Sequence, residues 1–241
     1  MSPELQTYLL VAVIVAIAAT IQGSTGIGFN MFAAPIVALI EPAFLPGPLL
    51  MLAAMVSVGV MLREFRAIDV QGVCYSLAGR LPASFLAGYS MALMAKSAFA
   101  VFFSVLVLAA VGISIAGWAV QPSKKNLLLA GVASGYMGTI TSIGAPPMAL
   151  IYQHAPGPRV RATISAFFVV GVVFSLGALA TFGHFGLDHV IMSLKLIPSL
   201  VIGFLISGPI KRFVDKGRVR VAVLSISALS AIVLLGKQVL F

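Results

Sequence analysis

Acidic residues are scarce in this chain, and their positions exclude several mechanisms. Only six Asp and Glu residues occur among 241, and all six fall at the ends of apolar segments. Charged residues of both signs make up 9% of the chain, against about 25% in a soluble domain. The sequence therefore argues against a soluble protein, a carboxylate proton relay and a sodium site built from acids.

Cysteine and the common catalytic motifs are also lacking. Cys74 is the single cysteine, so no disulfide or thiolate metal site can form within one chain. The sequence contains no phosphate-binding Gly-x-x-x-x-Gly-Lys-Ser/Thr loop, no His-Glu-x-x-His motif and no Cys/His cluster. It predicts no enzyme activity, no metal and no cofactor.

Apolar residues dominate instead, at 61% of the chain with a mean hydropathy of +1.13. They form long runs punctuated by Pro, Gly or charge, and most are near the 20 residues or so that cross a bilayer as a helix. The ten-residue alternation of a membrane β-barrel does not occur. We predict an all-α polytopic membrane protein with about eight membrane segments in one domain, residues 1–241. The runs are 5–21, 29–40, 45–62, 70–94, 98–120, 127–151, 162–182, 190–210 and 219–241.

Two polar interruptions of these runs resemble each other. The first is QGSTGIGFNMFAAPIVALI at 22–40, and the second is GYMGTITSIGAPPMAL at 135–150. Broken helices at matching points of two half-sequences indicate a transporter's binding site. We therefore predict two homologous halves, at about 5–120 and 125–241. A shift of 112 positions places Gly23, Gly26 and Pro35 on Gly135, Gly138 and Pro147.

Basic residues cluster at 63–66, 124–125, 159–161 and 211–220, and the net charge is +9. In a membrane protein such loops face the cytoplasm, so the charge predicts orientation and not a nucleic-acid partner. The clusters at 124–125 and 159–161 flank one apolar segment, so both ends of that segment should face the cytoplasm. A re-entrant hairpin bent at Gly135–Gly144 would explain this. Its first arm, Leu127–Ser134, would span eight residues, about 12 Å of helix.

By the same argument, the break at residues 22–30 makes the first two segments a hairpin that enters from outside. Two hairpins that enter from opposite sides would make the halves inverted repeats. Leu5–Ile21, however, has 17 residues and could cross the membrane fully. A parallel duplication with eight full spans therefore remains open.

Two cations lie inside apolar runs. Arg80 and Lys195 each stand shortly before a Pro, with a Gly five or six residues beyond the Pro, which predicts that they are matched between the halves. A charge at the bilayer centre costs at least about 2.5–3.5 kcal/mol and indicates a functional site. Because no acid stands nearby to neutralise them, the cations favour an anionic ligand.

Helix N-termini, glycine backbone and hydroxyl groups at the interruptions suit an oxyanion as well. The predicted substrate-binding residues are Gly23, Ser24, Thr25, Gly26, Asn30, Arg80, Gly135, Gly138, Thr139, Thr141, Ser142 and Lys195.

The GSTGIGF…AAP block at 23–35, its echo at 135–147 and the Pro–Gly helices after Arg80 and Lys195 resemble the TauE/SafE family. These are sulfite-exporter-like permeases, also called the toluene sulfonate uptake permease family. The resemblance implies a multi-pass carrier of the bacterial inner membrane for sulfite, sulfonates and related organosulfur anions. Phe29–Asn30 and Ile140–Ile143 depart from the family pattern, which often has glycines there.

We therefore expect a secondary transporter of a small organosulfur-type anion that works by alternating access. Its partners would be the anion and the lipid bilayer, with no nucleic acid; a homodimer is left open. The alternatives are an anion channel of the same architecture and a carrier for a small carboxylate. A membrane-embedded enzyme or an assembly subunit is disfavoured, since no nucleophile–base pair or metal set is found.

Overall fold

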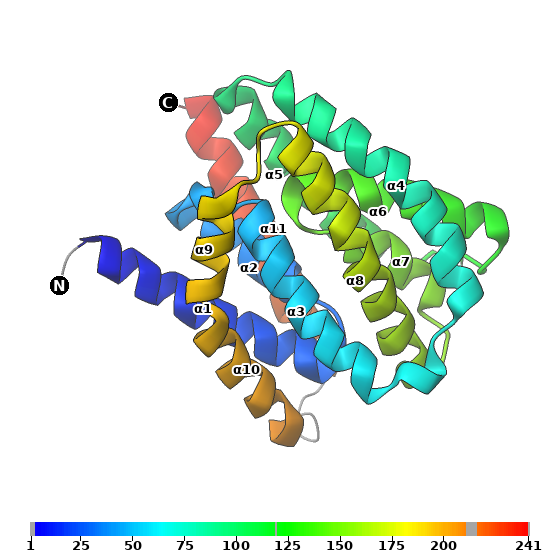
Figure 1. The fold of residues 1–241 in the computed structure, drawn as a ribbon. Coiled ribbons are helices and arrows are strands. Elements are labelled where there is room, and N and C mark those ends of the chain that lie inside the picture. Colours follow the sequence, from blue (N-terminus) through cyan, green and yellow to red (C-terminus); the bar gives the residue numbers. More distant parts are fainter. Residues whose placement is uncertain (1–2, 119, 211–215, 241) are drawn as a thin grey trace.

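The computed structural model describes residues 3–118, 120–210 and 216–240, and these residues form eleven α-helices and no strand (Figure 1). The all-α prediction is confirmed. The helices are α1 (Pro3–Thr25), α2 (Phe29–Ile40), α3 (Gly47–Arg63), α4 (Val70–Ala92), α5 (Lys96–Ala116), α6 (Lys124–Thr141), α7 (Ala145–Tyr152), α8 (Gly157–Thr181), α9 (Leu187–Lys195), α10 (Ile197–Ile210) and α11 (Lys216–Leu240), with 3₁₀ turns η1 (Pro42–Phe44) and η2 (Phe65–Ala67).

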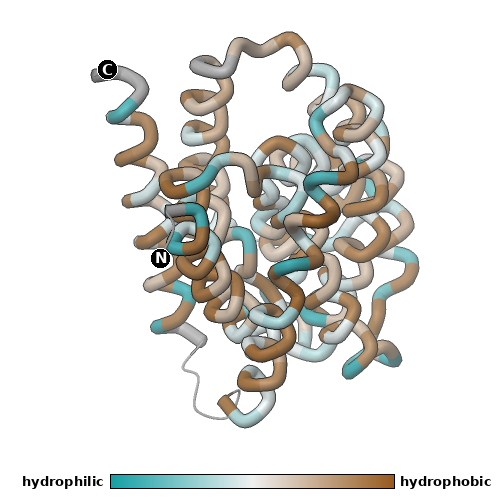
Figure 2. Tube along the Cα trace, turned by 60° about the vertical axis from the view of Figure 1, so that its left-hand side comes forward, coloured by the Kyte–Doolittle hydropathy of each residue, from teal (hydrophilic) through white to brown (hydrophobic). Residues whose placement is uncertain are grey.

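Four of the described helices are long and apolar enough to cross a bilayer: α1, α5, α8 and α11. The α9–α10 pair, bent by 47°, could form a fifth span. The predicted number of about eight is not confirmed. Hydrophobic residues recur along the whole trace in Figure 2, and many large ones are exposed, such as Leu86, Val173 and Leu205. Such side chains suit a surface that faces lipid.

Both helix breaks lie within the predicted interruptions, but the helices before them run further than the sequence predicts. α1 continues through Gly23 to Thr25, and α6 continues through Gly135 and Gly138 to Thr141. A glycine inside a helix costs only about 1 kcal/mol, which packing can offset. The helices end where the backbone enters the left-handed region, near Gly26 (φ 89°) in the first half and at Ser142 (φ 65°) in the second. The predicted eight-residue arm is therefore wrong: α6 has 18 residues.

The α6–α7 pair is a hairpin whose two ends lie at one end of the molecule. Lys124, which begins α6, has its Nζ 5.5 Å from the ring of Tyr75 in the second turn of α4. Arg159, which follows α7, has its Nη2 2.9 Å from Oδ2 of Asp69, the N-cap of α4. Both basic clusters thus lie beside the start of α4, as the hairpin prediction requires. We call this end of the molecule the basic end.

The α1–α2 pair is a hairpin that opens at the opposite end. The Tyr8 hydroxyl, near the start of α1, donates to the carbonyl oxygen of Lys195. Ser193, two residues earlier, donates from Oγ to the carbonyl oxygen of Pro48, in the first turn of α3, at 3.5 Å. The start of α1 and the chain beyond α2 therefore meet the same segment. The first arm of this hairpin, α1, nevertheless has the 23-residue length of a complete span.

The two halves pack on each other reciprocally. α4 packs on α6 and α10 on α1; α5 packs on α7 and α11 on α2; α3 packs on α8. The glycines repeat the pattern, because Gly79 lies against the carbonyl of Leu128 and Gly203 against that of Ala16. Leu128 and Ala16 are separated by the same shift of 112 positions. Reciprocal packing with hairpins that open at opposite ends is the arrangement of inverted repeats; the halves' boundaries stay a prediction.

Labelling of introduced cysteines tests the hairpins in the membrane. In a Cys74→Ser background, Ser123→Cys and Gly157→Cys should both react with an impermeant maleimide only from the cytoplasmic side, because they begin and follow the α6–α7 hairpin. Ala43→Cys, exposed in η1 at the other end, is the control and should react from outside. Labelling of positions 123 and 157 from opposite sides would contradict the hairpin.

Candidate functional site

The two helix breaks contact each other. Asn30, in the first turn of α2, donates from Nδ2 to the carbonyl oxygen of Ser142 at 2.9 Å. Ser142 is the αL residue that ends α6, and its Oγ donates to the carbonyl oxygen of Pro46 at 2.9 Å. Asn30 and Ser142 are 112 residues apart, which is the repeat shift. Equivalent points of the two halves therefore meet.

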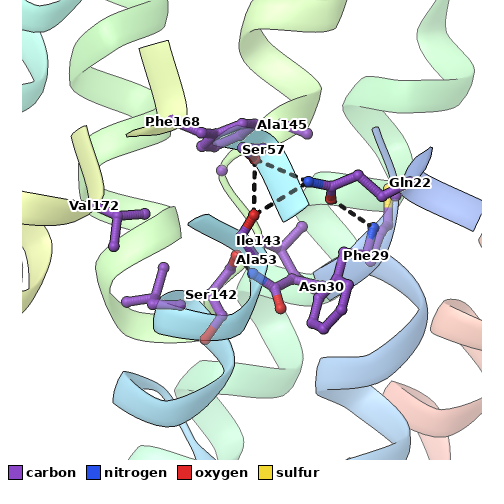
Figure 3. A pocket seen from close by; sticks show the side chains of 14 residues that line it. Gln22, Phe29, Asn30, Ala53, Ser57, Ser142, Ile143, Ala145, Phe168 and Val172 are labelled. Atoms are coloured by element: carbon purple, nitrogen blue, oxygen red, sulfur yellow. Dashed lines mark hydrogen bonds between the residues drawn. The ribbon is translucent and has the colours of Figure 1, made fainter. Parts of the chain in front are cut away.

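A small cavity of about 30 Å³ lies between the breaks, with room for about two water molecules (Figure 3). Its walls come from both breaks, from α3 and from α8. The lining residues are Gln22, Gly28, Phe29, Asn30, Met31, Leu50, Ala53, Ser57, Ser142, Ile143, Gly144, Ala145, Phe168 and Val172.

A polar side chain ties together the two sides of each break. Gln22 Oε1 accepts a hydrogen bond from the Phe29 N–H at 3.2 Å, while its Nε2 donates to Ser57 Oγ at 2.9 Å (Figure 3). Ser134, 112 positions after Gln22, donates from Oγ to the Gly144 carbonyl at 2.5 Å. These hydrogen bonds hold the backbone at each break, where the helix is interrupted. Each break therefore keeps a defined shape around the cavity.

Arg80 is the largest fully buried side chain of α4, with 0% exposure. Its Nη1 donates to Ser134 Oγ at 3.3 Å and its Nη2 to Ser175 Oγ at 3.2 Å. Its Cζ lies 4.9 Å and 5.5 Å from the ring centres of Phe167 and Phe168. Among the described residues no carboxylate pairs with it. The charge is thus stabilised by neutral hydroxyls and aromatic faces only.

Arg80 lies one residue behind the cavity wall. The Ser134 hydroxyl that accepts from the guanidinium also donates to Gly144, which lines the cavity. Two glycines allow Arg80 to lie this close to the second break. A Cβ at Gly138 would lie 3.2 Å from the Gly144 Cα and 3.7 Å from Arg80 Nη2. A Cβ at Gly171 would overlap the guanidinium. In such a poorly solvated place the positive charge acts strongly on the cavity.

Most of the predicted hydroxyls are engaged within the protein. Ser24 donates to the Thr20 carbonyl at 2.7 Å, Thr139 to Ser175 Oγ at 2.9 Å and Thr141 to the Met137 carbonyl at 2.7 Å. Of the predicted site residues, the structure places Asn30 and Ser142 on the small cavity and Arg80 behind it. Gly23, Gly26, Gly135 and Gly138 are contact points of the packing.

Lys195 is exposed at the end of α9 and lines neither this cavity nor the larger one described below. The predicted match between Arg80 and Lys195 is wrong. Gly79 of α4 lies against the carbonyl of Leu128 and Gly203 of α10 against the equivalent carbonyl of Ala16, and the next residues are Arg80 and Phe204. The apolar Phe204 therefore occupies the place in α10 that Arg80 has in α4. The bend between α9 and α10 separates the Lys195 motif from that position.

The sequence reasoning missed Gln22 and Ser57. Gln22 stands within the first interruption, and its polar counterpart Ser134 at the repeat shift was an available signal. Ser57 stands alone in an apolar run, and no sequence signal separates it from the other small residues there.

The family model described as sulfite exporter TauE/SafE matches residues 10–234. The chain belongs to the TauE/SafE family. No curated protein and no solved structure gives a match. The family and the apolar helices together make this chain a multi-pass membrane protein, of a family that transports sulfur-related anions.

A larger cavity of about 430 Å³ adjoins the small one in this TauE/SafE chain. Gly28 and Met31 line both cavities. Its other walls include Thr25, Gln153 and Arg220, so it extends toward the basic end. Residues 211–215 of the fourth basic cluster lie outside the described residues. The large cavity thus lies between that end and the breaks.

Two ion pairs join the halves at the basic end. The Arg161 guanidinium donates to both carboxylate oxygens of Glu64, with Nε 2.8 Å from Oε2, and its side chain packs against Gly26. Arg159 pairs with Asp69.

Asp69 also caps α4, accepting from the Gly72 N–H at 3.0 Å. Burial acts to raise the pKa of Asp69. Hydrogen bonds from Gly72, Arg159 and Tyr152 outweigh this effect and hold its pKa below the usual value. The ion pair of Asp69 with Arg159 is therefore intact at neutral pH.

The packing of Gly138 against Gly144 yields a test. Gly138→Leu should abolish uptake of the transported anion, because the leucine side chain would fill the second break beside Arg80. Gly177→Leu, on α8 with no atom within 4 Å of its Cβ position, is the matched control and should retain uptake. Both variants are compared in proteoliposomes after their amounts and thermal stabilities are shown to be equal. Normal uptake by Gly138→Leu would mean that the second break is not part of the site.

Proposed function

We propose that this protein is a secondary transporter that carries a small sulfur oxyanion, sulfite or a sulfonate, by alternating access. The proposal rests on one observation above all: two helix breaks from opposite ends meet around a small cavity with polar side chains in its wall, and the buried Arg80 lies directly behind it. The organosulfur preference comes from the TauE/SafE family. The bacterial inner membrane is the proposed location, and lipid and the anion are the proposed partners; a homodimer stays a prediction.

The sign of the ligand charge follows from Arg80. A buried cation that is hydrogen-bonded only to neutral groups keeps most of its desolvation cost. An anion in the adjoining cavity would offset part of that cost, whereas a cation would add to it. The same argument applies to a small carboxylate, so the charge alone does not choose between the two anion classes.

Donors for the anion come mainly from the first break. The first turn of α2, Gly28 to Met31, lines the cavity with the positive end of its helix dipole. α7 contributes less, because Pro146 and Pro147 in its first turn carry no N–H. The site is therefore asymmetric within a symmetric scaffold.

Alternating access requires the two hairpins to move against each other around this site. The larger cavity would then be the path from the basic end, which is cytoplasmic by the distribution of its Lys and Arg. The Glu64–Arg161 pair bridges the end of α3 and the start of α8 beside that path, and its separation would accompany the change of state.

Substitution of Arg80 tests the proposed site. Arg80→Ala should reduce sulfite uptake at least about 100-fold, since a lost buried charge partner costs 3 kcal/mol or so, and Arg80→Lys should retain part of it. Lys195→Ala is the control cation and should keep uptake. Uptake is measured with labelled sulfite in proteoliposomes. Normal sulfite uptake by Arg80→Ala would contradict the assignment of Arg80 to the anion site.

The same vesicles separate a carrier from a channel. Unlabelled sulfite loaded inside should accelerate entry of the label if the protein is a carrier. A channel would show no such trans-stimulation.

A further inference from the structure

One buried acceptor on the cavity wall lacks a donor. Asn30 is 9% exposed and lines the small cavity. Its Oδ1 is buried and receives no hydrogen bond from any described residue. An unpaired buried acceptor is costly and is uncommon in folded proteins, so its persistence calls for an explanation.

The orientation of this amide follows from its partner. The Ser142 carbonyl can only accept, so the Asn30 Nδ2 must face it, as the 2.9 Å hydrogen bond shows. Rotating the amide would bring two acceptors together and leave the NH₂ group unused. The second break thereby fixes Oδ1 as a hydrogen-bond acceptor on the cavity wall.

The other side chains that could act in place of a ligand are engaged. Gln22 bonds to Ser57 and Phe29, and Ser142 Oγ bonds to Pro46. A ligand in this cavity therefore meets one acceptor in need of a donor, in the field of a buried cation. A metal cation would also bind Oδ1, but Arg80 disfavours it, and none of the described residues that line the cavity is acidic.

We propose that this site selects sulfur oxyanions that themselves carry a hydrogen-bond donor, and that Asn30 Oδ1 accepts from that donor. Hydrogensulfite and hydroxylated sulfonates have this chemistry, whereas sulfite dianion and plain alkanesulfonates do not. The inference rests on the proposed function, because it concerns the ligand of the same cavity.

A matched pair of ligands tests the proposal. 2-Hydroxyethanesulfonate and ethanesulfonate differ in one hydroxyl group, and competition with sulfite uptake gives the affinity of each. The wild-type protein should bind the hydroxylated ligand roughly 10-fold tighter, which corresponds to about 1.4 kcal/mol. Equal affinities would overturn the inference and leave the proposed function standing.

Asn30→Leu separates ligand recognition from a structural role. The variant should lower the affinity ratio to about 1 by weakening the hydroxylated ligand more than ethanesulfonate. A merely structural asparagine would weaken both ligands equally, which would contradict the proposal. Ser76→Ala is the control: Ser76 Oγ is also buried without a described partner but does not line the cavity, so its ratio should stay unchanged.

Three further outcomes are informative. If sulfite binds but neither sulfonate does, the affinity of the wild-type protein for sulfite must rise toward low pH, where hydrogensulfite prevails. Asn30→Leu must lose this rise. A wild-type affinity that does not change with pH overturns the inference. Sodium-dependent binding that disappears in Asn30→Leu would assign Oδ1 to a cation and also overturn it. If neither sulfite nor a sulfonate binds, the proposed function itself fails.

Discussion

The hydrogen bond from Asn30 to the Ser142 carbonyl joins the two breaks, and the geometry of the site depends on it. At each break the helix ends in the left-handed region of the backbone, which frees carbonyl and N–H groups from the helix ladder. Such groups are tolerated inside a membrane protein only where protein or a cavity surrounds them. Because equivalent residues of the halves meet, each break covers the other and the cavity forms at the junction.

Around this junction the scaffold is symmetric and the chemistry is not. Arg80 and Phe204 occupy equivalent places on α4 and α10, yet one is a buried cation and the other is apolar. A single charge biases the cavity toward anions while limiting the desolvation cost to one buried ion. A second buried cation at Phe204 would repel the first through a medium that screens poorly.

The two ends of the central α3–α8 pair are also held by different chemistry. At the basic end Arg161 holds Glu64, and at the other end the ring of Phe185 packs on Gly47. Both partners of this ion pair are largely buried, with 10% and 17% of the two side chains exposed. Its separation requires water or new partners to reach both charges, whereas the aromatic contact at the other end relies on close packing.

Sequence alone determined the all-helical membrane class, and it predicted a duplication at a shift of 112 and a functional role for Arg80, because hydropathy, repeated glycines and an unpaired charge are local signals. Only the tertiary structure decided where the helices break, since packing can keep Gly23 and Gly135 helical. It also separated Lys195 from the site and brought Gln22 and Ser57 into it. These outcomes depend on which surfaces meet across the two halves, and no spacing along one chain encodes that directly.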